Sequence, residues 1–420
     1  MNASRADDRP DLGLFDAYGI ELEYMIVDGE RLSVLPAADR VLHALAGEFV
    51  NEVETGALAW SNELALHVIE LKTNGPVRSL AGLHQTFQRD VARLNALLTP
   101  LGGLLMPTAM HPWMDPARET RLWPHGHSAI YQAFDRIFSC RGHGWSNLQS
   151  MHINLPFADD DEFARLHAAI RMTMPLMPAL AASSPAMEGR LTGVLDNRLE
   201  VYRDNCARIP SVSGRIIPEP AWSRRAYETE ILQRIYRDLA PLDPEGVLQH
   251  EWVNARGAIA RFERNTIEIR VLDTQECPAA DIAVAGLIVE AVRALTEEHW
   301  CSLRHLQKWD SGPLQRLFMQ CVQQADHAVI EDDRYRAVFG FPERGPCRAR
   351  DLWQHLIETL FAQGAVPPTE WRDWHRLYQR RGCLARRISD ALGKAPAPDQ
   401  MAAIYRRLCD CLAQGALFDG

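Results

Sequence analysis

Several motifs that define common enzyme classes are missing from this 420-residue chain. It has no G-x-x-x-x-G-K-[ST] phosphate loop, no strand-linked G-x-G-x-x-G and no H-E-x-x-H zinc helix. A P-loop, a Rossmann site and a zincin are therefore unsupported. The G-x-S-x-G elbow is also missing, so a Ser-His-Asp or Cys-His site has little support, although the members of such a site are often far apart in sequence.

An excess of positive charge is missing as well. The chain has 45 Lys and Arg residues against 55 Asp and Glu residues, a formal net charge of −10. Such a chain offers no basic field to attract a nucleic-acid backbone. Nucleic acid is therefore not expected as a partner.

There is no long apolar run. The longest uncharged stretch, residues 94–114, is interrupted by Pro100, Gly102, Pro107 and Pro112. No membrane span is predicted. The first residues, MNASRADDRPD, are polar and acidic and have no apolar core. They resemble neither a signal peptide nor a transit peptide, so a cytoplasmic protein is expected.

Paired cysteine motifs are also missing. The nine cysteines include no C-x-x-C, and the closest two are Cys409 and Cys411. This scatter predicts reduced thiols, with neither a disulfide framework nor a zinc site.

The residues that are present predict an antiparallel sheet that carries helices. Strands are expected at 18–27, 61–73, 103–109, 148–155 and 258–272, and helices at 79–98 (with Ser79 as N-cap), 161–174, 222–239 and 278–300. Regular βαβ alternation is missing, which favours antiparallel pairing. After about residue 300 the pattern becomes helical, and Trp353, Trp371 and Trp374 are expected to serve packing.

Three predicted strands have one polar and one apolar face, because side chains alternate along a strand. In YGIELEYMIV, Glu21 and Glu23 oppose apolar neighbours. The other two polar faces are Ser150, His152 and Asn154 in QSMHINLPF, and Arg264, Thr266, Glu268 and Arg270 in RNTIEIRVLD. Each face alone is compatible with a solvated strand.

Two further carboxylates, Glu63 and Glu70, lie seven residues apart in NELALHVIELKTNGPV. This odd separation puts them on opposite faces of a straight strand, so a turn or bulge between them is required if both serve one site. Together with Glu21, Glu23 and Glu268 they would repel one another unless cations were present. Mg²⁺ takes oxygen ligands and is commonly completed by substrate phosphates, so the pattern indicates a metal-nucleotide site.

Five segments occur in a recognisable order: GIELEYMI, ELALHVIELKTNGPV, GGLLMPTAMHPW, QSMHINLPF and TIEIRVLD. As an ordered set, over roughly residues 15–300, they resemble the type 2 glutamate-cysteine ligase family of ATP-dependent carboxylate-amine ligases. The resemblance implies an α+β, glutamine-synthetase-like fold, in which a curved antiparallel sheet with flanking helices carries acidic metal ligands. It also implies a catalytic domain over residues 1–300 and a helical C-terminal portion, residues 301–420, packed on it.

The family phosphorylates a carboxylate and then lets an amine displace the phosphate. The resemblance thus implies an ATP-dependent carbon-nitrogen ligase with a small-molecule carboxylate and a small-molecule amine as substrates. Its cofactors would be ATP and Mg²⁺, with Mn²⁺ as the alternative ion. A homo-oligomer and a monomer both stay open.

The resemblance also implies roles for individual residues. The family's metal-ligand positions match Glu21, Glu23, Glu70, His152 and Glu268. Arg270 matches the catalytic arginine that faces the transferred phosphate, and Arg264, on the same face, is assigned with it to the nucleotide. Glu63 is either a metal ligand or a contact to the substrate amine.

The stretch TGVLDNRLEVYRDNCARIPSVSGR occupies the place of the family's substrate-binding segment, a Thr-Gly followed by Ser/Asp-x-Arg. Arg198 fits its arginine best, and Arg215 is the second choice. The sequence from Leu195 to Leu199 departs from the common pattern, which leaves the substrate pair open. A metal-dependent hydrolase and a non-catalytic nucleotide-binding relative remain alternative functions.

Overall fold

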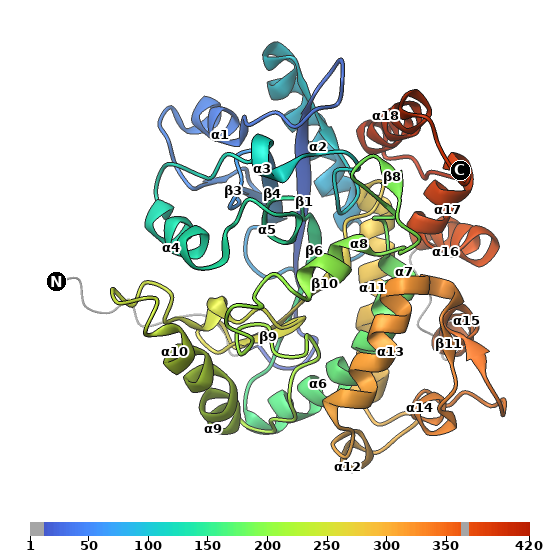
Figure 1. Cartoon of the computed structure of the whole chain (residues 1–420). Coiled ribbons are helices and arrows are strands. Elements are labelled where there is room, and N and C mark those ends of the chain that lie inside the picture. Colours follow the sequence, from blue (N-terminus) through green and yellow to red (C-terminus); the bar gives the residue numbers. More distant parts are fainter. Residues whose placement is uncertain (1–11, 363–368) are drawn as a thin grey trace.

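An eight-stranded antiparallel sheet forms the centre of the protein (Figure 1). The computed structural model describes residues 12–362 and 369–420, so the polar N-terminal stretch and Pro367-Pro368 lie outside the described residues. The strands are β1 (Gly19–Asp28), β2 (Glu52–Glu54), β3 (Leu58–Asn62), β4 (Val68–Thr73), β5 (Gly103–Met106), β6 (Ser150–Pro156), β9 (Ala258–Arg261) and β10 (Thr266–Asp273). Their order is β2-β3-β4-β1-β6-β10-β9, and β5 pairs with the second half of β1.

Helices cover the apolar face of this sheet. Ile20 and Leu22 of β1 lie in one core with Phe87 and Val91 of α2 (Leu83–Leu98). The helix α11 (Pro278–Thr296) is apolar along most of its length, and it packs against both α2 and α6 (Asp160–Thr173). The predicted one-sided sheet with flanking helices is therefore confirmed.

The remaining helices are mostly short or lie late in the chain. They are α1 (Ala38–Ala46), α3 (Pro116–Glu119), α4 (Ser128–Phe138), α5 (His143–Ser146), α7 (Met177–Ala181), α8 (Asn197–Tyr202), α9 (Arg224–Tyr227), α10 (Gln233–Leu239), α12 (Leu303–Leu306), α13 (Ser311–Gln324), α14 (Asp333–Val338), α15 (Ala349–Ala362), α16 (Thr369–Arg381), α17 (Leu384–Leu392) and α18 (Pro398–Gln414). A π-helical turn, Glu228–Leu232, joins α9 to α10. Two small hairpins, β7 (Ala186–Met187) with β8 (Arg190–Leu191) and β11 (Val329–Ile330) with β12 (Cys347–Arg348), lie outside the central sheet.

Some predicted boundaries are wrong for local reasons. The helix expected from Ser79 begins at Leu83, because Gly82 takes a left-handed conformation (φ 76°) at the cap. Ser79 instead accepts a hydrogen bond from the backbone N–H of Ala81. The strand expected over 103–109 ends at Met106, and the region 258–272 is a hairpin whose turn contains Asn265 in a left-handed conformation.

The segments after residue 300 are helical apart from the β11–β12 hairpin, and in Figure 1 they gather on the right-hand side. Trp353, Trp371 and Trp374 are buried in the main core, as expected for packing residues. The ring of Trp371 lies directly against Gly286 of α11, where a side chain would collide with it. The division at residue 300 stays a prediction.

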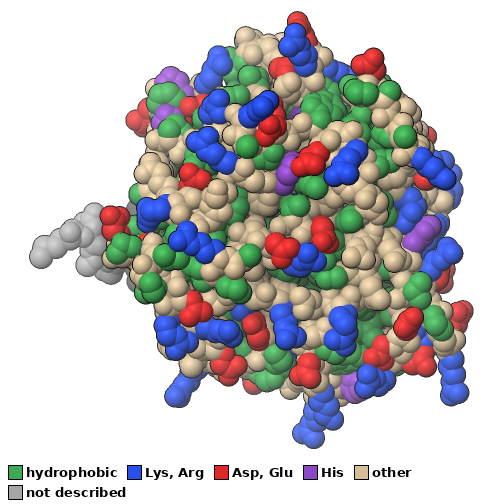
Figure 2. Space-filling view, viewed as in Figure 1, with side chains coloured by type: hydrophobic (Ala, Val, Ile, Leu, Met, Phe, Trp, Pro, Cys, Tyr) green, Lys and Arg blue, Asp and Glu red, His purple; other side chains and the backbone are tan. Residues whose placement is uncertain are grey.

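All nine cysteines are free thiols, which confirms the expected absence of disulfides. Figure 2 shows acidic and basic side chains interspersed on the visible face. Among the described residues, no helix is both long and apolar enough to cross a membrane.

The end of the chain is attached to the core by a buried ion pair. Arg387 of α17 pairs with Glu276 (Nη1 to Oε1, 2.6 Å), and both side chains are about fully buried. The carbonyl of Phe418 accepts a hydrogen bond from Arg387, and its N–H donates to Glu276 (3.3 Å). Glu276 follows β10 closely, so this contact joins the C-terminal residues to the exit of a central strand.

Replacing Glu276 by Gln should destabilise the protein by about 3–5 kcal/mol, because Arg387 would stay buried without its counter-charge. The matched control is Glu228→Gln in the exposed Arg224–Glu228 pair, where the expected loss is below about 1 kcal/mol. Urea unfolding followed by circular dichroism measures both. Equal losses would contradict the structural role of the buried pair.

Candidate active site

The polar side chains of the sheet lie in rows across neighbouring strands. Residues directly opposite in an antiparallel pair place their side chains on the same face. The strand register produces one row of Ser61, Glu70 and Glu23, and a second row of Lys72, Glu21 and His152. Beside the second row, Asn154 of β6 pairs with Glu268 of β10. The polar faces predicted for separate strands therefore form one surface.

Glu63 and Glu70 reach this surface from different strands. β3 ends at Asn62, the chain turns over residues 63–67, and β4 returns antiparallel to β3 with Glu70 opposite Ser61. The turn that the odd spacing requires is thus present. Glu63 lies at its start, next to the carboxylates of the sheet.

Two overlapping triads result from this arrangement. One oxygen or nitrogen atom each of Glu21, Glu70 and His152 lies within 4.8 Å of the others, and the same holds for Glu23, Glu63 and Glu70. Glu70 belongs to both triads. We call the residues Glu21, Glu23, Glu63, Glu70, His152 and Glu268 the acidic cluster.

Neighbouring groups hold two of these carboxylates in place. His152 Nδ1 lies 2.9 Å from Glu21 Oε2, and Asn154 donates to Glu21 Oε1 (2.9 Å). Glu23 accepts hydrogen bonds from the backbone N–H (2.7 Å) and the hydroxyl (3.1 Å) of Ser150. The ligand atoms are therefore oriented by the fold itself, as expected for a preorganised metal site.

Burial and mutual repulsion shift the pKa values of several groups in the cluster. Burial and the charge of Glu21 raise the pKa of Glu70 to about 7. Burial and the charges of Glu23 and Glu70 raise the pKa of Glu63 well above its usual range. Burial opposes a charged His152, but its hydrogen bond with Glu21 and the surrounding carboxylates outweigh burial and raise its pKa to about 9. Hard divalent cations prefer oxygen ligands, so this carboxylate-rich donor set fits such an ion.

Glu268 lies beside the triads but belongs to neither of them. Its Oε1 is 3.6 Å from His152 Nδ1 and pairs with Arg270, while its Oε2 lies 3.2 Å from Arg261 Nη1. These charges, Arg270 first, outweigh burial and lower the pKa of Glu268. A bulge in β10 between Ile269 and Leu272 shifts the register with β6 at Arg270.

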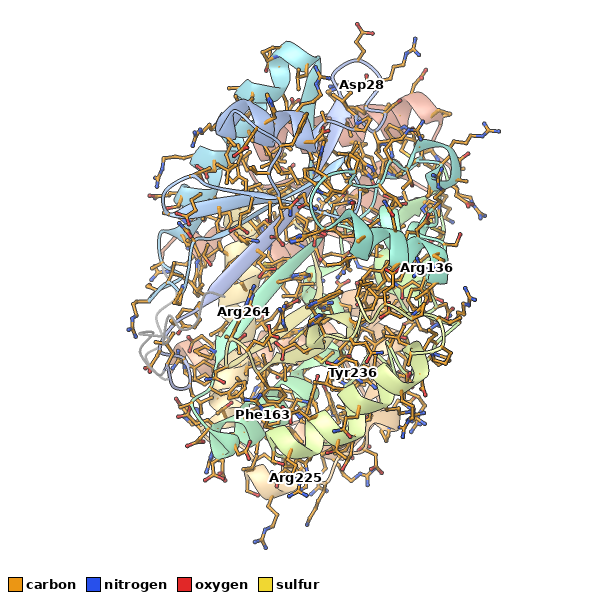
Figure 3. All side chains as sticks on the ribbon, turned by 90° about the vertical axis from the view of Figure 1, so that its left-hand side faces the viewer. Asp28, Arg136, Phe163, Arg225, Tyr236 and Arg264 are labelled. Carbon is orange, nitrogen blue, oxygen red and sulfur yellow. The ribbon has the colours of Figure 1, made fainter. Side chains whose placement is uncertain are left out.

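A cleft of about 600 Å³ opens next to the cluster. Glu21 and Lys72 line it from β1 and β4, and Arg264 lines it from the β9–β10 turn. Figure 3 labels Arg264 close to the ends of these central strands. The two predicted nucleotide contacts are therefore separated, with Arg264 in the cleft and Arg270 beside Glu268.

The two arginines predicted to bind substrate lie in different surroundings. Arg198 of α8 is buried, with Nε 2.5 Å from Asp273 Oδ1 and Nη1 3.3 Å from the carbonyl of Arg270. Arg215 is exposed beside Gly312 at the start of α13. Between described residues, no contact joins Arg215 to the acidic cluster.

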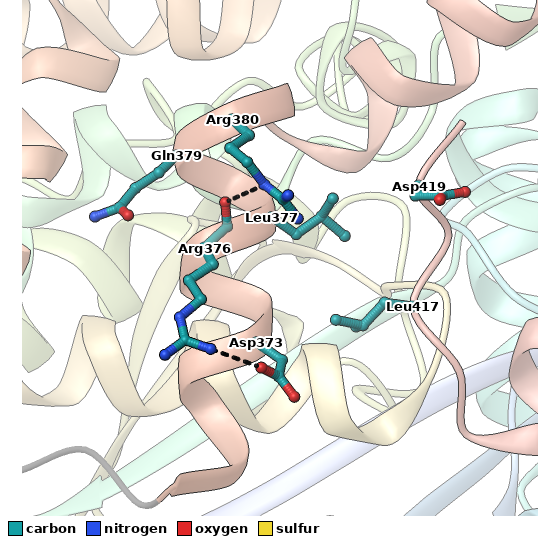
Figure 4. Close-up of a pocket in the computed structure, with 7 residues that line it drawn as sticks. All are labelled: Asp373, Arg376, Leu377, Gln379, Arg380, Leu417 and Asp419. Atoms are coloured by element: carbon teal, nitrogen blue, oxygen red, sulfur yellow. Dashed lines mark hydrogen bonds and ion pairs between the residues drawn. The ribbon is translucent and has the colours of Figure 1, made fainter.

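A separate surface hollow of about 680 Å³ lies between α16 and the C-terminal residues (Figure 4). Asp373, Arg376 and Arg380 face it from the helix, and Leu417 and Asp419 face it from the chain end. None of the predicted site residues lines it.

The sequence reasoning missed several polar partners of the cluster. Lys72 Nζ lies 3.0 Å from Glu70, and Arg261 shares Glu268 with Arg270. Ser61 donates a hydrogen bond to Glu70 (2.6 Å). The alternation of side chains that placed Glu70 on the polar face also places Lys72 there, two residues later in the same strand. Ser61 and Arg261 could be found only through the strand register.

The antiparallel sheet with helices on its apolar face, and with the acidic cluster and cleft on its other face, has the predicted glutamine-synthetase-like fold. The model of glutamate-cysteine ligase family 2 matches residues 17–321. The chain belongs to this family.

Individual relatives agree with this assignment. A protein of Archaeoglobus fulgidus that carries no functional name is 38% identical over 67% of this chain and 75% of its own length. A protein of Rubrobacter xylanophilus, provisionally named glutamate–cysteine ligase 2-3, is 27% identical over 68% of this chain and 75% of its own. The crystal structure of glutamate–cysteine ligase from Francisella tularensis in complex with AMP shares the fold, with a TM-score of 0.57 at 13% identity, over 94% of this chain and 89% of that one.

The cluster predicts opposite stability effects for two of its carboxylates when no metal is added. Glu63→Gln should leave the melting temperature unchanged or raise it, because Glu63 faces the carboxylates of Glu23 and Glu70. Glu268→Gln should destabilise the protein by about 3 kcal/mol, because Arg261 and Arg270 lose a shared counter-charge. Scanning calorimetry in chelator compares them, and equal shifts would show that the two sites do not differ in charge balance.

Proposed function

We propose that the protein is an ATP-dependent carboxylate-amine ligase that works through an acyl phosphate. The observation that carries this proposal is the pair of triads that share Glu70, one of which reaches the cleft through Glu21. Membership in a ligase family supports it independently. Phosphoryl transfer requires positioning and charge neutralisation more than covalent participation by the protein, and this site offers both.

The residues divide into two groups by location. The triad residues other than Glu63 would hold Mg²⁺ or Mn²⁺, which supplies positive charge to the phosphates of ATP when bound. Arg264, at the opposite end of the cleft, would contact the nucleotide. Arg270 is held by Glu268 with its guanidinium beside the cluster, and we assign it to the phosphate that is transferred.

In the proposed reaction, a carboxylate oxygen of the substrate attacks the γ-phosphorus of ATP. The bond to the β-γ bridging oxygen breaks, and ADP leaves. The amine nitrogen then attacks the acyl carbon, the bond to the phosphate oxygen breaks, and inorganic phosphate leaves. The amine loses one proton, which we assign to Glu63 as the least buried carboxylate of its triad.

Glutamate and cysteine are the first substrates to examine, because the family is named for them. The departure from the common pattern at Leu195–Leu199 supports a different pair. Arg198 lies within this segment and is held by Asp273, so the end of β10 fixes its orientation. Arg198 is the proposed contact to a substrate carboxylate.

An ADP-release screen tests the proposal. Amino acids and dicarboxylic acids are combined with amines or hydroxylamine, and products are identified by mass spectrometry. ADP should appear only when a carboxylate, an amine and a divalent cation are all present, and chelator should abolish it. Product formation without ATP would assign a hydrolase instead. ATP binding without turnover over the whole panel would assign a non-catalytic role.

Replacing Arg270 by Lys should lower kcat by roughly 10²–10³, because an ammonium keeps the charge but loses the planar fork that matches a phosphoryl group. The affinity for ATP should fall much less than the rate. The control is the melting temperature of the same preparation, measured by calorimetry. It should hardly change, because a lysine at position 270 can still form an ion pair with Glu268. Normal turnover, or a variant that does not fold, would refute the assigned role.

A further inference from the structure

Lys72 is the unexplained cation of the site. Its Nζ lies 2.7 Å from Glu52 Oε2, 3.0 Å from Glu70 Oε1 and 3.1 Å from the hydroxyl of Ser61. Its side chain is 27% exposed, and it lines the 600 Å³ cleft together with Glu21. The ammonium group of Lys72 thus contacts the acidic cluster, and its side chain also borders the open cleft.

The composition of the chain makes this lysine unusual. Only three of the 45 basic Lys and Arg residues are lysines: Lys72, Lys308 and Lys394. Lys308 and Lys394 are exposed on the surface. A compact ammonium on a flexible stem, where arginine is otherwise used, suits a site in which the cation must move between partners.

The position of Lys72 conflicts with an occupied metal site. Glu70, its partner, is the carboxylate common to both triads. A divalent cation between the triad atoms would repel an ammonium held 3.0 Å from Glu70. The long side chain can then turn into the cleft, where Arg264 lies on the other side of β1.

We propose that Lys72 binds the phosphate chain of the nucleotide, and that it exchanges Glu70 for phosphate when a divalent cation occupies the triads. This inference rests on the proposed function and adds a phosphate contact on the β4 side of the cleft. Lys72 and Arg264 then flank β1, so that an anionic ligand lying across that strand meets one cation on each side.

A purely structural role is the competing explanation. Glu52 lies on β2, the edge strand, and Lys72 of β4 reaches it across β3 while also pairing with Glu70 of its own strand. On that explanation, removing Lys72 would lower stability without a specific effect on the binding of phosphates. The two roles therefore differ in ligand binding.

The first experiment uses titration calorimetry with Mg²⁺ and ATP, ADP or adenosine. Lys72→Met should weaken ATP binding by about tenfold or more, and adenosine binding should stay unchanged. Lys72→Arg should retain most of the affinity. The matched control Glu52→Gln, which removes the other partner of Lys72, should stay within about twofold of the unmodified protein. Equal ATP affinity in Lys72→Met would overturn the inference.

A second experiment uses the unmodified protein, so it does not depend on whether a variant folds. An amine-acetylating reagent is applied, and peptides are quantified by mass spectrometry with Lys308 and Lys394 as internal references. Mg²⁺ alone should increase the labelling of Lys72, and Mg²⁺ with ATP should suppress it, whereas adenosine should not. If the extent of Lys72 labelling is the same with and without ATP, the inference is also overturned.

The results distinguish a failure of the proposed function from a failure of the role assigned to Lys72. If the unmodified protein binds no Mg²⁺ and ATP at all, the proposed function fails. If it binds them while Lys72 is insensitive in both experiments, only the role of Lys72 fails. Binding of Mn²⁺ alone, measured by electron paramagnetic resonance, should be equal or tighter in Lys72→Met, because a competing cation is removed; weaker Mn²⁺ binding would contradict the exchange.

Discussion

The repulsion among carboxylates on one face of the sheet is the constraint that shapes the site. Two ionised groups 4.8 Å apart repel by roughly 3 kcal/mol at the effective dielectric of a protein surface. This repulsion is larger than the stabilisation that one exposed ion pair contributes. The metal-free protein reduces the repulsion through retained protons, a cationic His152 and the ammonium of Lys72. Each of these is a substitute for positive charge that a divalent cation would supply.

The alternation of side chains in the sequence was enough to predict most of this surface. It separated Glu21 and Glu23 from Leu22, and it showed that Glu63 and Glu70 required a turn between them. The register between strands was beyond the sequence, because it depends on how distant strands pair. For that reason the positions of Lys72 opposite Glu21, and of Arg261 next to Glu268, could not be predicted.

Other parts of the prediction depended on local geometry that composition does not encode. The left-handed Gly82 moved the start of α2 by one turn from Ser79. Arg215 was a candidate because of its place in the sequence, yet its side chain lies beside Gly312 at the start of α13. Arg198 pairs with Asp273 at the end of β10, and this pairing brings it next to the carbonyl of Arg270.

The end of β10 also explains why the sheet and the helices after residue 300 depend on each other. Four consecutive polar residues, Asp273 to Glu276, are fully buried at this strand exit. Asp273 binds Arg198, Thr274 donates to the carbonyl of Glu23 (3.2 Å), and Glu276 binds Arg387 of α17. A buried polar group that loses its partner costs stability. The acidic cluster, the segment with Arg198 and the C-terminal helices therefore share one set of obligatory hydrogen bonds. The C-terminal helix α17 therefore stabilises the exit of β10, since Glu276 would otherwise be a buried charge without a counter-ion.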